Sequence, residues 1–172
     1  MTSPFRELFA IDQRRALEFF AVRLQDVIES TVARDELLYN ASVLAHYAQV
    51  STCSSVDVPT PVNLSVVFDR FVVDPSVRHD AALLETAGAQ CLLLAGFFED
   101  QMRERHNIRW YARLGAGFFK RAAVQVSSPD KARLLDAIAD GFEPWRQRHA
   151  KLSRELRDQP YLLSPPLRPS SP

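Results

Sequence analysis

A run of eight consecutive apolar residues, Cys91–Phe98, restricts the possible folds of this chain more than any other feature of its sequence. A helix that crosses a bilayer needs about 20 apolar residues, so this run is too short to span a membrane. A helix that is apolar on every side must be surrounded by protein. The run therefore predicts a buried central helix over about 75–106, and Asp74 followed by Pro75 is a typical signal for its start.

Elsewhere in the chain, apolar residues recur at intervals of three and four, which is the spacing of one buried helix face. The helices predicted from this spacing start at Pro4, cover about 35–50 and about 108–126, and begin again after Ser128. The predicted buried faces are Leu17, Phe20, Leu24, Val27 and Ile28 in the first helix, Leu38, Ala41, Leu44, Ala45 and Ala48 in the second, and Leu135, Ile138, Phe142, Trp145, His149, Leu152 and Leu156 in the last.

Proline and serine mark the breaks between these helices. Pro144 interrupts the last helix and predicts a kink near Asp140–Gly141, because proline cannot complete the helical hydrogen bonding. Ser51–Asn63 is predicted to be a loop, and a short helix is expected to follow from Leu64 to Val72, although the valines of Leu64–Val73 would also suit a strand. We therefore expect an all-α, single-domain bundle of about five to six helices over residues 1–158. A Pro/Ser-rich tail over 159–172 is expected to be extended or disordered.

The charges of the chain balance, since 21 basic and 21 acidic residues give a formal net charge of zero. This balance argues against a chain-wide electrostatic field for nucleic acid or anionic membrane. Two arginine-rich segments, 103–113 and 146–157, keep a local nucleic-acid contact open. The alternative is a pair of solvated helix faces with counter-charges at Glu104, Glu155 and Asp158.

The N-terminal residues show no secretory signal, and the two cysteines, Cys53 and Cys91, suit free thiols in a reducing compartment. The sequence therefore predicts a cytoplasmic protein. It has no nucleophile motif, no glycine-rich phosphate loop and no helical pair of histidines at metal-ligand spacing, so we predict no catalytic residue, no metal and no cofactor. Glu99 and Asp100 are expected to mark the point where the central helix re-enters solvent.

Small residues suggest where the central helix meets a neighbour. Gly88 and Gly96 lie eight residues apart in the central helix, and Ala112, Gly115 and Ala116 cluster in the following one. Each glycine costs about 1 kcal/mol in a helix interior, so a close helix crossing is the expected compensation. We predict that these two groups of small residues face each other.

Candidate binding groups are dispersed along the sequence. A small-molecule pocket between the central helix and the 108–126 helix is one possibility. Its candidate binding residues are His46, Tyr47, Trp110, Tyr111 and His149. His149 occupies a buried-face position between Trp145 and Leu152. It is interpreted either as a hydrogen-bonded interior histidine or as a pH-sensitive or ligand-contacting group.

The favoured function class is an interaction or regulatory protein that self-associates or binds a protein partner. The chain contains eleven phenylalanines, and Trp110, Phe118 and Phe119 could exceed what one small core can bury. An exposed apolar patch would then mark a partner surface. A small-molecule-binding or enzymatic bundle is the second hypothesis, and nucleic-acid binding is the third.

The segments Leu84–Phe98 and Trp110–Arg121 share a pattern of glycines and paired aromatic residues. They resemble a group of small all-helical bacterial proteins in which a Gly-Asp-x-x-Leu-Phe-Leu-x-Gly-Phe-Phe helix precedes a Tyr-Tyr-x-x-x-Gly-x-x-Ala-Tyr helix. This chain departs from the pattern at Ala89, where the group has an acid, and at Glu99, where it has proline. The resemblance implies an all-α fold and brings no activity with it.

Overall fold

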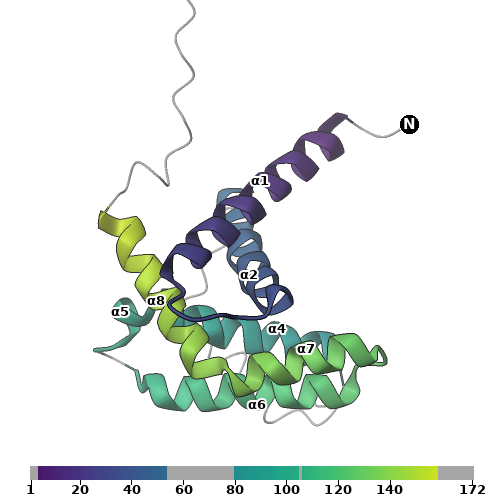
Figure 1. Cartoon of the computed structure of the whole chain (residues 1–172), viewed down its shortest axis with the longest axis vertical. Coiled ribbons are helices and arrows are strands. Elements are labelled where there is room, and N and C mark those ends of the chain that lie inside the picture. The colour runs from purple at the N-terminus through teal and green to yellow at the C-terminus, as the bar shows by residue number, and fades with distance from the viewer. Residues whose placement is uncertain (1–3, 54–79, 105, 159–172) are drawn as a thin grey trace, which may run out of the picture.

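The computed structural model describes residues 4–53, 80–104 and 106–158, and every element in these ranges is a helix (Figure 1). The all-α fold predicted from the sequence is therefore confirmed for this part of the chain. Leu64–Val73, Asp74-Pro75 and the tail over 159–172 lie outside the described residues. The elements are α1 (Pro4–Val27), α2 (Arg34–Cys53), α4 (Ala81–Leu92), the π-helix η3 (Leu93–Phe97), α5 (Glu99–Met102), α6 (Ile108–Gln125), α7 (Pro129–Asp140) and α8 (Phe142–Asp158).

The central helix is shorter than predicted and consists of three segments, α4, η3 and α5. Asp80 has extended backbone angles, and its carboxylate accepts a hydrogen bond from the Leu83 amide at 3.2 Å. The predicted continuous helix from residue 75 is therefore wrong, because Asp80 caps a new helix at Ala81. The central helix also ends earlier than predicted, at Met102. Asn107 caps the start of the next helix, α6.

The apolar run lies at the centre of the bundle, and residues 91–96 are all buried. In η3 the chain adopts π-type hydrogen bonding, with the Phe98 amide donating to the Leu93 carbonyl at 2.9 Å. Arg146 of α8 donates to the carbonyl of Ala95 in this turn at 3.1 Å. The π-turn is thus fixed to α8 by a buried side chain. Such turns are rare in proteins and often lie at functional sites.

Glycines mark close contacts of the central helix with two different neighbours. A Cβ atom at Gly88 would lie 3.0 Å from the Phe119 ring of α6, and one at Gly115 would lie 2.7 Å from Cys91 Cβ. Gly96 packs against α8 instead, where a Cβ atom would meet His149 Cβ at 2.9 Å. The prediction that Gly96 faces the 108–126 helix is therefore wrong. The π-turn changes the rotation per residue, so Gly88 and Gly96 do not share one face.

The other predicted small residues lie on α6. Ala112 is buried, whereas Ala116 is half-buried, so the contact with the central helix passes mainly through Gly115. Figure 1 shows α6 running alongside α4 and α7. The three helices enclose the larger of the two apolar clusters of the bundle.

The helices α7 and α8 behave as one helix with a kink at Gly141, as predicted. The Gly141 amide donates to Ala137 and the Trp145 amide donates to Gly141, so helical bonding continues on both sides of the break. Pro144 has no amide hydrogen to give to the Asp140 carbonyl, which explains the position of the kink. The whole predicted face is buried, which confirms it: Leu135, Ile138, Phe142, Trp145, His149, Leu152 and Leu156.

The helices α1 and α2 form a hairpin that packs on α8, and the first turns of α1 project beyond the rest of the bundle (Figure 1). The helix α2 extends to Cys53, so the predicted loop does not begin at Ser51. The predicted face of α2 is wrong at Leu38, which is 39% exposed, while Leu37 packs inward. The buried residues of the hairpin are Phe20, Leu24, Val27, Ala41, Leu44 and Ala45, whereas Leu17, Ile28 and Ala48 are half-buried.

Candidate functional site

The predicted binding residues do not converge on one site. His46 and Tyr47 lie on α2, Trp110 and Tyr111 lie in the first turn of α6, and His149 lies in the core. The helices α4 and α6 meet through close contacts at Gly88 and Gly115, so the predicted pocket between them is closed along this crossing. His46 and Tyr47 instead line a groove on another side of the central helix.

This groove lies between α2 and α4 and has a volume of about 450 Å³. We call it the α2–α4 groove. Each helix contributes residues at intervals of three and four, which is one helix face. The lining residues are Tyr39, Ser42, Val43, His46 and Tyr47 from α2, and Ala82, Glu85, Thr86, Ala89, Gln90 and Leu93 from α4 and the start of η3.

One end of the α2–α4 groove is held by charge and hydrogen bonding. The Tyr39 hydroxyl donates to Glu85 Oε1 at 2.9 Å, and Lys131 Nζ of α7 lies 3.0 Å from the same oxygen. Burial, reinforced by the Glu85 carboxylate, raises the pKa of Tyr39 far above its ordinary value. Tyr39 is therefore a neutral phenol that donates, and Lys131 balances the charge of Glu85. This end serves to position the two helices.

The other end of the groove carries polar side chains that have no hydrogen-bond partner among the described residues. The Tyr47 ring packs edge-on against Phe98, with centroids 5.2 Å apart, and partial burial raises the pKa of its hydroxyl. His46 is exposed and Gln90 is half-buried. Among the described residues, neither side chain makes a hydrogen bond. An imidazole, an amide and a phenol are thus available at one end of a mainly apolar groove.

His149 is an interior histidine rather than a ligand contact. It is fully buried, and its Nε2 lies 2.8 Å from Asn40 Oδ1. The Asn40 amide donates to the Glu36 carbonyl, so Nε2–H of His149 is the donor in this pair. Among the described residues, Nδ1 of His149 has no hydrogen-bond partner. Burial lowers the pKa of His149 to about 3, so the ring is neutral in the folded protein.

The buried His149 predicts acid sensitivity. Its ordinary pKa is near 6.5, so below that pH the unfolded chain takes up a proton that the folded protein excludes. The stabilisation is complete above pH 6.5 and is lost as the pH falls towards 3, by at most about 1.4 kcal/mol per pH unit. Urea unfolding at several pH values should show a steeper loss for the wild type than for His149→Leu. His46→Ala, at an exposed position, should keep the wild-type slope; equal slopes for wild type and His149→Leu would contradict the prediction.

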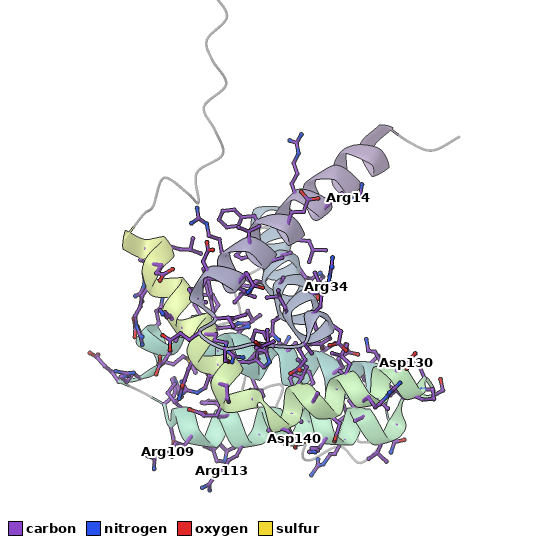
Figure 2. The ribbon with its side chains drawn as sticks, in the orientation of Figure 1. Arg14, Arg34, Arg109, Arg113, Asp130 and Asp140 are labelled. Atoms are coloured by element: carbon purple, nitrogen blue, oxygen red, sulfur yellow. The ribbon has the colours of Figure 1, made fainter. Side chains whose placement is uncertain are left out.

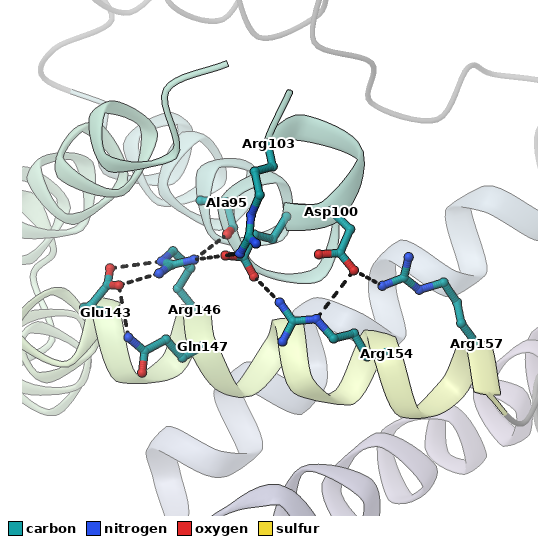
Figure 3. Close-up of polar contacts among 9 residues, drawn as sticks. Ala95, Asp100, Arg103, Glu143, Arg146, Gln147, Arg154 and Arg157 are labelled. Atoms are coloured by element: carbon teal, nitrogen blue, oxygen red, sulfur yellow. Dashed lines mark hydrogen bonds and ion pairs between the residues drawn. The ribbon is translucent and has the colours of Figure 1, made fainter. Parts of the chain in front are cut away.

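Arginines of the second basic segment are bound to acidic residues of the central helix (Figure 3). Glu99 is only 8% exposed; it accepts hydrogen bonds from Arg103 at 2.7 Å and Arg154 at 2.8 Å, and it forms an ion pair with Arg146 at 3.2 Å. Asp100 accepts from Arg157 as well. Glu99 therefore does not mark a return to solvent, contrary to the prediction.

The partners of these arginines also differ from those predicted. Within the described side chains, the counter-charges are Glu99, Asp100 and Glu143 instead of the expected Glu104 and Glu155, and the side chain of the expected Asp158 lies outside the described residues. Figure 2 shows Arg109 and Arg113 of the first basic segment on the outer side of α6, projecting away from the bundle. The sequence contains one signal for these ion pairs. Arg146, Arg154 and Arg157 recur at helical spacing, and Glu99 directly follows the buried run.

The aromatic residues that were expected to exceed the core are mostly inside it. Phe118 is 1% exposed and Phe119 is fully buried, so that prediction is wrong for both. Trp110 is 41% exposed and packs edge-on against Tyr111, with centroids 4.9 Å apart. The missing side chain of Gly88 leaves space for the Phe119 ring, which a Cβ atom there would meet at 3.0 Å.

In the described ranges, no group of three His, Cys, Asp or Glu side chains could hold a metal ion. No helix there is long and apolar enough to cross a membrane. Comparison with protein-family models, with curated proteins and with solved structures finds no match. The resemblance of Leu84–Phe98 and Trp110–Arg121 to a group of bacterial proteins therefore stays a prediction. The α2–α4 groove must be interpreted from its own chemistry.

Proposed function

We propose that this protein binds a small, mainly apolar molecule in the α2–α4 groove. The observation that supports the proposal is the combination of an apolar lining with the free polar groups of His46, Tyr47 and Gln90 at one end. Ligand sites typically have this composition, with a few polar groups that fix the orientation of an apolar body. A volume of about 450 Å³ also suits a small molecule.

The lining indicates the chemistry of the ligand. Its apolar body would lie against Val43, Ala89 and Leu93, and its polar end would hydrogen-bond to His46 and Gln90. An uncharged or weakly acidic end fits best, because the charge of Glu85 is already balanced by Lys131. The groove supports binding rather than catalysis, since Glu85 is held by Tyr39 and Lys131 and serves to position the helices.

Titration with the neutral fluorophore Nile red tests the proposal. The wild type should bind the dye saturably, with one site per chain. Ala89→Phe fills the groove and should weaken binding at least about tenfold, equivalent to about 1.4 kcal/mol. Val124→Phe, at a position of α6 that is 81% exposed, is the matched control and should bind as the wild type does. Thermal unfolding of each variant checks that the fold is kept. Unchanged binding by a folded Ala89→Phe would overturn the proposal.

The polar end is tested separately with 1-decanol, a neutral amphiphile, by displacement of the dye. Gln90→Leu keeps the size of the side chain and removes its hydrogen bonds. It should weaken decanol binding several-fold and leave Nile red binding unchanged, because one buried hydrogen bond contributes about 1 kcal/mol. Equal decanol affinities for Gln90→Leu and the wild type would exclude a role for Gln90 in orienting the ligand.

A further inference from the structure

The outer face of the α1–α2 hairpin carries exposed apolar side chains. Val22 of α1 is 62% exposed and Leu38 of α2 is 39% exposed. Together with Val32 and Leu37 they line a groove of about 490 Å³ between the two helices. We call this surface the α1–α2 face. Among the side chains that the structure describes, Trp110 and Val124 are the further large apolar residues with comparable exposure, and both lie on α6. Exposed apolar residues that gather in this way are typical of a partner surface.

The same groove carries one charge of each sign. Asp26 lies at the α1 side and Arg34 at the α2 side. Neither forms an ion pair within the described residues. Arg34 lies in the first turn of α2, where Asp35 and Glu36 offset the unfavourable position of a cation. Asp26 and Arg34 are each therefore able to pair with an opposite charge on a partner.

This surface differs from the α2–α4 groove. Tyr39, Val43 and His46 line the α2–α4 groove, whereas Arg34, Leu37 and Leu38 line the α1–α2 face. At 100° per residue these two sets lie on opposite sides of α2. The groove of the α1–α2 face also lacks the free imidazole and phenol of the ligand groove. A protein surface is therefore a better occupant for it than a small molecule.

We propose that a second copy of this chain docks on the α1–α2 face through a twofold axis. A twofold contact places the same patch of both copies together, so a patch must be complementary to itself. Asp26 of one copy then lies opposite Arg34 of the other, and the reverse pair forms at the same time. Val22 and Leu38 of both copies are buried between the two charge pairs. Two hairpins joined in this way make a four-helix arrangement.

Sedimentation equilibrium over a wide range of protein concentration tests for the dimer. The wild type should show a monomer–dimer equilibrium with a dissociation constant in the micromolar range. The double variant with Val22→Glu and Leu38→Glu should raise the dissociation constant of the dimer at least tenfold, because charges replace the apolar contact. Val124→Glu changes an exposed valine of α6 and should leave the equilibrium unchanged. A wild type that stays monomeric at 100 μM, or equal weakening by Val124→Glu, would overturn the proposal.

A charge exchange tests the twofold arrangement itself. Asp26→Arg alone and Arg34→Asp alone each place like charges opposite one another, so each variant should dimerise poorly. A mixture of the two variants restores both opposite-charge pairs and should form a heterodimer at least tenfold more tightly than either homodimer. Circular dichroism confirms that each variant is folded. Failure of the mixture to associate better than its components would overturn the twofold pairing, whereas Ala89→Phe should dimerise normally because it changes only the ligand groove.

Discussion

Gly115→Ala should lower the free energy of unfolding by about 1–3 kcal/mol, although alanine is the better helix former. A Cβ atom at this position would lie 2.6 Å from Cζ of Phe142 and 2.7 Å from Cβ of Cys91. Both neighbours are buried, and Cys91 Cβ cannot move without moving α4. The methyl group would therefore force α4 and α6 apart. Urea unfolding followed by circular dichroism measures the effect.

The matched control lies two residues further along the same helix. A Cβ atom at Gly117 would meet nothing within 4 Å. Gly117→Ala should therefore stabilise the protein by about 0.5–1 kcal/mol, because only the helix propensity and the unfolded chain change. The two substitutions are chemically identical, so opposite signs isolate the helix crossing. If Gly115→Ala stabilised the protein as Gly117→Ala does, the close contact of α4 with α6 would be contradicted.

Glu99→Gln should destabilise the fold by about 3 kcal/mol, which is typical for removal of one partner from a buried ion pair. Glu99 forms ion pairs with Arg103, Arg146 and Arg154. Arg146 is itself only 8% exposed, and in the variant its charge would face a neutral amide instead of this carboxylate. The remaining Glu143 side chain is more than half exposed and balances its charge less well.

Asp100→Asn is the control for this second prediction. Asp100 also forms ion pairs with two arginines, Arg154 and Arg157, but its side chain is 33% exposed. Exposed pairs contribute at most about 1 kcal/mol and are screened by salt. Urea unfolding at low and high salt should show a large, salt-insensitive loss for Glu99→Gln and a small, salt-sensitive loss for Asp100→Asn. Equal losses in the two variants would contradict a buried role for Glu99.

Local sequence rules predicted the features that depend on one helix at a time. The buried run at 91–96, the kink at Gly141 and the buried face from Leu135 to Leu156 follow from spacing and proline chemistry, and the structure has all three. The start at Asp80 and the π-turn were missed. Several aspartate positions can cap a helix, and packing decides among them. A π-turn depends on contacts such as that of Arg146 with Ala95, which lie 51 residues apart.

The candidate site was less predictable because it depends on the arrangement of helices. His46 and Tyr47 were predicted as binding groups, and both line the α2–α4 groove. Trp110 and His149 were placed with them, yet they lie on other parts of the bundle. The lining residues Ala89 and Gln90 carry no signal of binding in the sequence. Their role follows only from the parallel course of α2 and α4, where Tyr39 lies beside Glu85 and Tyr47 beside Phe98.

Methyl NMR during titration with 1-decanol shows whether the α2–α4 groove binds a small apolar molecule with a polar end. The methyl signals of Val43, Ala89 and Leu93 should shift saturably and together, while those of Val22, Leu38 and Val124 stay unchanged. The groove methyls report on binding, and the other three report on nonspecific contact with exposed apolar surface. Saturable shifts confined to the groove are the result that we predict. Shifts at Val22, Leu38 or Val124 without shifts at Val43, Ala89 and Leu93, or no saturable shift at all, would contradict it.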